Sequence, residues 1–240
     1  MKKVKTINDK RIKSGIPNLD KLIGDGFEKN SINLIKGKRG IGKSIFGIQF
    51  IIEGLKNKER CLYVSFEEKK KTFYSNMKKL SWDLEEYEKK GLFTYLEYTP
   101  EKVNLMLEEG GGSIESIVLT KGITRLVIDC LTSFALLFKD ELERQEAVLS
   151  LSKMIREWGC TTIFTLEEDD NKDYDSQDFE SDSIIHLHYI MTKGERKRYL
   201  DIAKMRGVEH SEKVYEFEIK RGINIKSKPA SDSIAYLIPD

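Results

Sequence analysis

Cysteine is scarce in this sequence and follows no metal-binding pattern. The three cysteines, Cys61, Cys130 and Cys160, each lie in or beside an apolar run, and no two of them have CxxC spacing. An odd number cannot pair completely, and free cysteine is among the most buried residue types. We therefore expect buried, reduced thiols and neither a disulfide framework nor a cysteine-ligated metal.

Long apolar runs are also absent. No stretch approaches the roughly 18 to 20 residues that a membrane-spanning helix requires. The basic N-terminus lacks the apolar segment of a secretory signal peptide. The sequence accordingly predicts a cytoplasmic protein with no membrane partner.

The sequence has almost no net charge. Lys and Arg together number 41 and Asp and Glu 40, a formal charge of +1, so no global field attracts nucleic acid. Only four residues are proline, and 39% are hydrophobic, which is enough for a sizeable core. The length of 240 residues fits one α/β domain, which we place at residues 1–226, with a C-terminal tail at 227–240.

Short apolar runs alternate with helical patterns through the first two thirds of the chain, as in βα units with a parallel sheet. We expect strands at residues 31–36, 60–66, 92–97, 124–130 and 160–166. Residues 43–55 are apolar nearly all round and predict a buried helix. Residues 140–158 predict an amphipathic helix that Gly159 ends.

The pattern changes after residue 183, where we expect the helices to stop. Residues 184–191, 198–205, 214–219 and 223–225 predict successive short strands. They indicate an antiparallel extension of the sheet. The triplet at residues 110–112 predicts a flexible interruption.

The segment from Gly37 to Ser44 fits the motif GxxxxGK[ST], between a predicted strand and a predicted helix. In this motif the backbone N–H groups surround phosphates, the lysine contacts the β and γ oxygens, and the Ser hydroxyl ligates Mg²⁺. The sequence thus predicts binding of ATP with Mg²⁺. The expected nucleotide-binding residues are Gly37, Lys38, Arg39, Gly40, Ile41, Gly42, Lys43, Ser44 and Ile45, and Lys43 also has a catalytic role.

Acidic residues end two other predicted strands. Asp129 follows an apolar strand at the edge where open α/β sheets bind ligands, and we expect it to hold Mg²⁺ together with Ser44. Glu67 and Glu68 follow a strand that we expect to adjoin the phosphate-loop strand. Either carboxylate could align the water that attacks the γ-phosphate, and the sequence does not choose between them.

Together these motifs resemble those of the KaiC-like branch of RecA-superfamily ATPases, in its single-domain archaeal form. The resemblance starts at residues 14–27, similar to the family opening TGIxGLDxLLxGG, and includes the phosphate loop. It continues at residues 65–68, 127–129, 182–187 and 198–210, the last of which contains KMRGVEH. It implies a RecA-like three-layer α/β/α core with a mainly parallel central sheet and a C-terminal antiparallel strand extension.

The resemblance also implies a homo-oligomer, a hexameric ring with nucleotide at subunit interfaces. The Lys and Arg of the family's KMRG motif contact the γ-phosphate in the neighbouring subunit, which gives Lys204 and Arg206 a catalytic role in trans. Two features depart from the family. Lys38 and Arg39 stand where relatives carry small residues or proline, and the chain has one ATPase domain whereas the clock protein has two, so clock function does not transfer.

Two weaker signals point elsewhere. His186 and His188 lie two apart on one expected strand, but no third ligand is identifiable from spacing, so we expect no metal there. Residues 167–182 hold nine acidic residues and one base, Lys172. In RecA-like recombinases the corresponding loop contacts DNA, so this composition predicts no nucleic-acid binding. A basic protein partner or a solvated loop without a partner fits it equally.

The function predicted from the sequence is ATP hydrolysis by an oligomeric switch or regulator whose protein partner is unknown. Two alternatives remain open. One is a nucleotide-binding interaction module with little turnover, and the other is a RadA-like DNA recombination ATPase.

Overall fold

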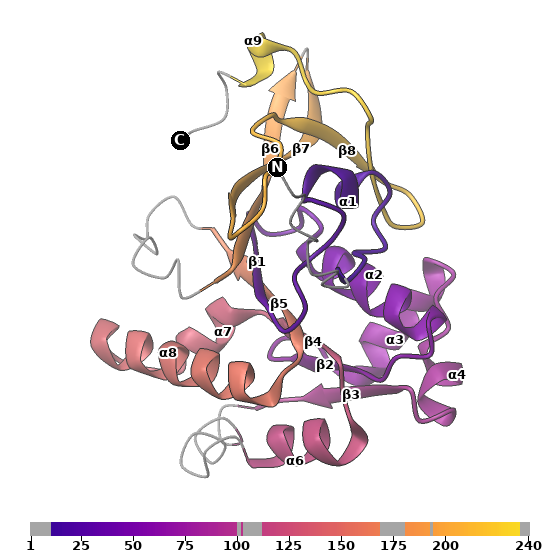
Figure 1. Ribbon diagram of the computed structural model, residues 1–240, viewed down its shortest axis with the longest axis vertical. Coiled ribbons are helices and arrows are strands. Elements are labelled where there is room, and N and C mark those ends of the chain that lie inside the picture. The colour runs from indigo at the N-terminus through magenta and orange to yellow at the C-terminus, as the bar shows by residue number, and fades with distance from the viewer. Residues whose placement is uncertain (1–10, 100–101, 103–111, 169–180, 193, 236–240) are drawn as a thin grey trace, which may run out of the picture.

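A computed structural model describes residues 11–99, 102, 112–168, 181–192 and 194–235. A 9-stranded sheet crosses the molecule in the order β3-β2-β4-β5-β1-β6-β7-β8-β9. Figure 1 shows this sheet between two groups of helices. The strands are β1 (Ile32–Gly37), β2 (Cys61–Ser65), β3 (Phe93–Glu97), β4 (Arg125–Asp129), β5 (Thr161–Glu167), β6 (Ser183–Thr192), β7 (Glu195–Met205), β8 (Tyr215–Ile219) and β9 (Ile223–Ile225).

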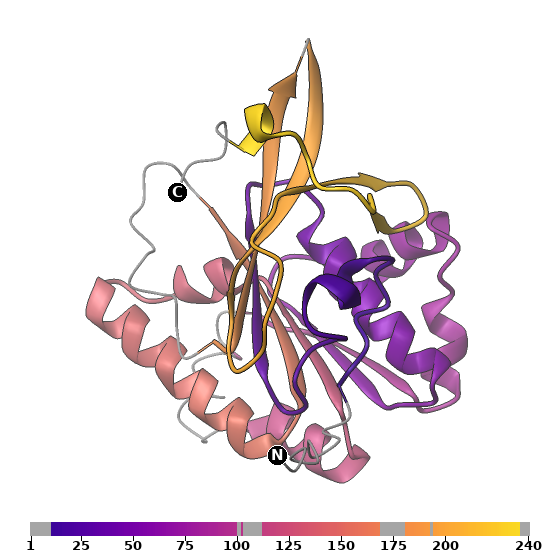
Figure 2. The same cartoon turned by 45° about the horizontal axis from the view of Figure 1, so that its top comes forward.

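The described helices divide between the two faces of the sheet. They are α1 (Leu19–Leu22), α2 (Lys43–Lys56), α3 (Lys70–Lys79), α4 (Leu84–Lys89), α6 (Gly112–Lys121), α7 (Leu131–Ala135), α8 (Glu141–Trp158) and α9 (Asp232–Ala235). Figure 2 separates the layers: α2, α3 and α4 lie on one side, and α6, α7 and α8 on the other. The three-layer α/β/α arrangement is therefore confirmed.

Each helical layer covers its own hydrophobic core. Phe46, Phe50 and Tyr63 belong to the cluster beneath α2 and α3, whereas Phe134 and Leu151 belong to the cluster beneath α7 and α8. Because both faces are covered, every residue of β1 and β2 is buried, as is every residue of β4 except Asp129. This explains why these strands have apolar runs without strict alternation.

Helix α8 begins and ends where its sequence predicts. The Asp140 side chain accepts a 2.8 Å hydrogen bond from the Glu143 backbone N–H, which satisfies one of the free donors of the first turn. Gly159 closes the helix in the left-handed conformation with φ 68°, which glycine adopts without strain.

The close approach of α2 to the sheet depends on glycine. A Cβ on Gly47 would lie 2.9 Å from Val127 Cγ1, and one on Gly54 would lie 2.5 Å from Arg125 Cδ. Two helical turns can therefore pack directly on β4 because these positions carry no side chain. This packing fixes α2, whose N-terminus faces the phosphate loop.

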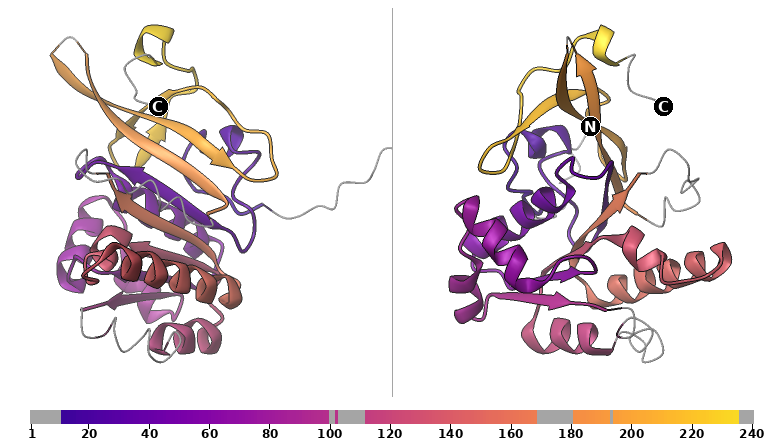
Figure 3. Two further views of the ribbon diagram at one scale, coloured as in Figure 1. Left: turned by 90° about the vertical axis from the view of Figure 1, so that its left-hand side faces the viewer. Right: turned by 180° about the vertical axis from the view of Figure 1, so that it is seen from behind.

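The sheet is parallel from β3 to β6 and antiparallel from β6 to β9. The antiparallel strands lie at one end of the molecule and α6 at the other (Figure 3). The predicted C-terminal extension is confirmed, with β7 starting at Glu195, three residues earlier than expected.

Two expectations need correction. Strand β2 does not adjoin the phosphate-loop strand, because β4 and β5 lie between β2 and β1. Helices also do not stop at residue 183, since α9 forms at Asp232–Ala235, within the segment expected as a tail. The domain boundary at residue 226 remains a prediction, and residues 110 and 111 of the expected flexible triplet lie outside the described residues.

Candidate nucleotide-binding site

The phosphate loop joins β1 to α2 at the carboxyl edge of the sheet. Gly40 and Gly42 have φ values of 77° and 124°, a backbone conformation that side chains disfavour. A Cβ on Gly42 would also lie 2.6 Å from Ile219 Cδ1. Lys38, Arg39 and Gly40 are exposed, whereas Ile41 is buried and Ile45 half-buried, so the loop is anchored at its C-terminal end.

Lys43 is the buried cation of this loop. Its Nζ donates hydrogen bonds to the carbonyl oxygens of Gly37 at 2.7 Å and Lys38 at 3.2 Å. Burial lowers the pKa of Lys43, and the nearby groups Glu167, Cys130, Asp129 and Glu67 oppose that shift. An ammonium held by backbone carbonyls beside acidic groups is well placed to contact phosphate oxygens.

Asp129 lies at the end of β4 and is held on both sides. Its Oδ2 accepts a 2.6 Å hydrogen bond from the Tyr63 hydroxyl, and its Oδ1 accepts a 2.5 Å hydrogen bond from Thr165 Oγ1. The Tyr63 hydroxyl also interacts with the Ser44 side chain. The Tyr63 hydroxyl therefore links the side chains of Ser44 and Asp129. Both side chains end in oxygen atoms, and oxygen is the ligand that Mg²⁺ prefers.

The two candidate glutamates lie differently. Glu67 lines a cleft of about 220 Å³ together with Arg39, Gly40, Gly42, Lys43, Ser44, Ile45, Asp129, Cys130 and Glu167. Its Oε1 accepts a 2.5 Å hydrogen bond from Ser133 Oγ. Glu68 is not among the residues that line this cleft, and its Oε1 accepts a 2.8 Å hydrogen bond from Asn76 on α3.

Burial raises the pKa of Glu68, with Asp129 and Glu67 adding to the shift and the Asn76 hydrogen bond opposing it. The geometry therefore favours Glu67 as the carboxylate that faces a bound phosphate. The wrongly expected strand order does not affect this choice, since β2 and β4 end side by side, with Ser65 opposite Asp129.

Glu167 lies at the site although the sequence motifs did not indicate it. It ends β5, the direct neighbour of β1, and pairs with Gly37 in the sheet register. Its Oε1 lies 3.5 Å from Arg39 Nε, and among the acidic groups near Lys43 it does most to oppose the lowering of the Lys43 pKa by burial. Tyr63 and Thr165 were missed in the same way, since strand order, not chain proximity, brings them to Asp129.

Lys204 and Arg206 lie at the opposite edge of the sheet. The Arg206 backbone N–H donates to the Asp182 carbonyl, and the Asp182 N–H donates to the Ile32 carbonyl at the start of β1. Lys204 pairs with Ile184. The phosphate loop follows the other end of β1, roughly 16 Å along the strand from Ile32 and roughly 10 Å from Leu34, which is level with Lys204, at about 3.3 Å per residue. The structure thus separates these two cations from the phosphate loop of their own chain.

A phosphate loop, an acidic strand end and a flanking glutamate on this sheet order define a P-loop nucleotide-binding protein with a RecA-like fold. A family model described as the ATPase domain KaiC matches residues 12–230. The chain therefore belongs to the KaiC family of ATPase domains.

The chain covers nearly the whole length of some relatives and less than half of another. The chain is 30% identical to a UPF0273 protein of Pyrococcus furiosus over 88% of this chain and 91% of the relative. It is 31% identical to a UPF0273 protein of Thermotoga maritima, with 88% and 93% covered. It is 27% identical to the circadian clock protein KaiC3 of Synechocystis, and spans 45% of that protein's length while 90% of this chain is covered.

A solved structure has the same fold. The crystal structure of a KaiC-like protein from Pyrococcus horikoshii superposes with a TM-score of 0.82 at 35% identity, over 90% of this chain and 98% of the other. The family and the RecA-like fold inferred from sequence are confirmed. In the described part of the chain, no helix is both long and apolar enough to cross a membrane.

Proposed function

We propose that this protein binds and hydrolyses ATP and acts as an oligomeric switch or regulator. The observation that carries the proposal is the convergence of Lys43, Ser44, Asp129 and Glu67 on one cleft at the carboxyl edge of the sheet. They come from three places in the fold, the start of α2, the end of β4 and the turn after β2, and each has the chemistry that a step of phosphoryl transfer needs.

Residues 37–44 would hold the phosphates through backbone N–H groups, and Lys43 would add a positive charge at the β and γ oxygens. Ser44 and Asp129 would hold Mg²⁺, which supplies charge neutralisation at the phosphates when bound. Glu67 would accept a hydrogen bond from the attacking water and align it with the γ-phosphorus. Ser133, which donates to Glu67, would orient that carboxylate.

We assign Lys204 and Arg206 a role that depends on assembly of several copies of the chain. Since they lie at the edge opposite to their own phosphate loop, a role at the γ-phosphate requires a neighbouring copy. A ring, hexameric as in the family resemblance, would bring these cations to the next subunit's nucleotide, where they would stabilise charge in the transition state.

The decisive experiment measures ATP binding in the presence of Mg²⁺, and phosphate release, for the natural protein and for Lys43→Ala. Loss of the charge-assisted hydrogen bonds is worth about 1.5–3 kcal/mol, so we expect affinity to fall about 10- to 100-fold. Lys56→Ala is the matched control, since it removes an exposed lysine from the last turn of the same helix.

Unchanged affinity in Lys43→Ala, with the fold intact, would contradict the phosphate-loop assignment. Tight ATP binding without measurable phosphate release by the natural protein would instead favour a nucleotide-binding interaction module. ATPase stimulation by single-stranded DNA would favour a recombination ATPase.

A further inference from the structure

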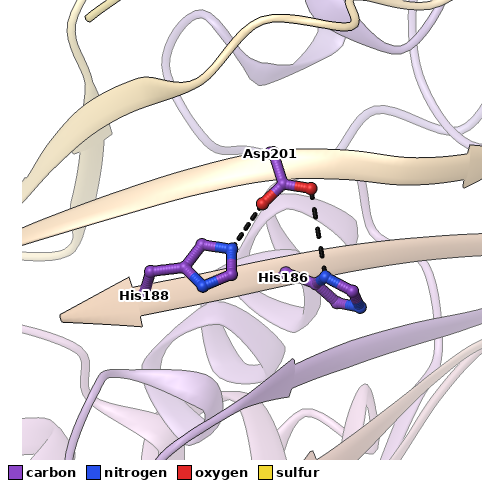
Figure 4. A group of neighbouring side chains, drawn as sticks. All are labelled: His186, His188 and Asp201. Atoms are coloured by element: carbon purple, nitrogen blue, oxygen red, sulfur yellow. Dashed lines mark hydrogen bonds and ion pairs between the residues drawn. The ribbon is translucent and has the colours of Figure 1, made fainter. Parts of the chain in front are cut away.

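The hairpin formed by β6 and β7 brings together the two strand histidines and a carboxylate. His186 and His188 alternate on one face of β6, and Asp201 on β7 lies directly opposite His186 in the antiparallel register. One ligand atom from each of the three side chains lies within 4.8 Å of the other two. Figure 4 shows both rings turned toward the single carboxylate between them.

The contacts within this cluster all converge on Asp201. His188 Nε2 hydrogen bonds to Asp201 Oδ1, and His186 Nδ1 lies 3.9 Å from Asp201 Oδ2. The two ring planes meet at 86° with their centroids 5.8 Å apart. Two nitrogens and a carboxylate thus point at one small volume from three directions.

We propose that His186, His188 and Asp201 bind Zn²⁺ or another late first-row divalent cation. Two imidazoles and one carboxylate form a borderline N/O ligand set, which suits these metals better than Mg²⁺ or Ca²⁺. A tetrahedral zinc ion with bonds of about 2.0–2.1 Å needs its ligands about 3.4 Å apart. The ligand atoms of the three side chains lie within 4.8 Å of one another, so metal binding would require them to adjust to that spacing.

The second ring nitrogen of His186 leaves the ring free to reorient. Nδ1 is the nitrogen that faces Asp201, and the buried Nε2 atom has no hydrogen-bond partner among the described residues. Because no hydrogen bond at Nε2 fixes the ring, the ring can turn to present either nitrogen to a metal.

The depth of the cluster allows a metal to enter. The side chains of His186 and Asp201 keep 25% and 22% of their surface exposed. Among the described residues, Lys36, opposite His186 on β1, and Glu168 after β5 are charged groups that act on His186, and their charges have opposite signs.

The site would join β6 to β7 with three protein ligands, leaving at least one coordination position for water or a further group. Asp201 lies three residues before Lys204 on the same strand. Binding of a metal would therefore stabilise the strand that contains Lys204 and leads into Arg206. The proposal does not depend on ATP hydrolysis.

The test measures metal binding by the full chain stripped with a chelator. Zn²⁺ binding is followed by calorimetry, and Co²⁺ is used as a spectroscopic probe through its visible absorption. We expect one Zn²⁺ per chain, competition by Co²⁺ for the same site, and no competition by a large excess of Mg²⁺. His186→Ala and His188→Ala should each weaken Zn²⁺ binding by at least about 10-fold.

His210→Ala is the matched control, because His210 is the remaining histidine of the chain and lies outside the cluster. Asp201→Asn tests the carboxylate with little change in shape and should also weaken binding at least about 10-fold. Circular dichroism and thermal melting of each variant separate ligand loss from unfolding.

Absence of Zn²⁺ binding by the natural protein would overturn the proposal. So would equal Zn²⁺ affinity in folded His186→Ala, His188→Ala and Asp201→Asn variants, since the metal would then lie elsewhere. Loss of binding in these three variants, with His210→Ala unaffected, supports it.

Discussion

Glu68 accepts a 2.8 Å hydrogen bond from Asn76 of α3, whereas its chain neighbour Glu67 accepts one from Ser133 and lines the phosphate-loop cleft. The two carboxylates therefore have different surroundings although their residues are adjacent in the chain. Helix α3 holds one, and the phosphate-loop cleft contains the other.

This difference predicts unequal effects of two matched substitutions. Glu67→Gln should lower the rate of phosphate release about 100-fold or more, the usual contribution of a group that aligns or deprotonates the nucleophile. Glu68→Gln should lower it less than about 10-fold. Both should keep ATP affinity, because neither carboxylate holds the nucleotide. Single-turnover phosphate release measures the effect, and a larger loss in Glu68→Gln would reverse the assignment.

The separation of Lys204 and Arg206 from their own phosphate loop predicts complementation between variants. Arg206→Ala and Lys43→Ala should each be nearly inactive, since a trans-acting cation contributes about 10³-fold or more. Mixing equal amounts should recover about a quarter of the natural activity, because about a quarter of random interfaces pair an intact loop with an intact cation.

The control for this mixture replaces Arg206→Ala with the double variant that lacks both Lys43 and Arg206. It supplies no intact phosphate loop, so activity should not return. Failure of the first mixture to recover activity, once subunit exchange is demonstrated by fluorescence, would argue against action in trans.

The acidic segment between β5 and β6 predicts weak binding of single-stranded DNA. Because its nine acidic residues and single lysine repel phosphates, we expect dissociation constants weaker than about 10 µM at physiological salt. Fluorescence anisotropy with a labelled oligonucleotide measures this, with and without ATP. Sub-micromolar affinity that falls with added salt would favour the hypothesis of a DNA recombination ATPase over that of a switch or regulator.

A fourth prediction concerns stability. The buried Arg125 side chain, 2% exposed, forms a bidentate ion pair with Glu59 at 2.8 Å and also donates to the carbonyls of Lys13 and Phe50. Arg125→Ala removes the guanidinium from all three of these acceptors, and breaking such a buried pair costs about 3–5 kcal/mol. Since Glu59 is 25% exposed and regains water, we expect a loss near the lower limit, about 3 kcal/mol.

Urea denaturation measures the change as a shift in midpoint at constant slope. Arg60→Ala provides the comparison, because exposed Arg60 donates, among the described residues, only to the Lys121 carbonyl, and it should cost less than about 1 kcal/mol. Equal losses in the two variants would show that the buried pair adds no stability.

Sequence patterns predicted the buried strands best. β1, β2, β4 and β5 were placed within one residue, because helices cover both faces and the central residues of these strands are mostly apolar. Helices α3 and α4 were not predicted. Only Phe73, Tyr74, Met77 and Leu84 are buried in them, so lysine and glutamate dominate their composition and hide the apolar stripe.

The same limit applies to the sites. Lys43 and Ser44 were found because their motif is contiguous, and Asp129 because it ends an apolar strand. Glu167 reaches Lys43 only through the order β4-β5-β1, and Asp201 meets His186 only through an antiparallel register. Local composition specifies neither strand order nor register, so pairwise partners of this kind appear only in three dimensions.

The placement of the phosphate loop and of the Lys204–Arg206 pair on opposite edges of one sheet has a consequence for stoichiometry. If both contribute to one reaction, an isolated protomer has no complete centre, and an open row of n copies has n − 1 because its terminal loop lacks a neighbour. Only closure into a ring gives every copy a complete centre. Specific activity should then rise with protein concentration and reach a plateau when rings are complete, so dilution alone would act as an off switch.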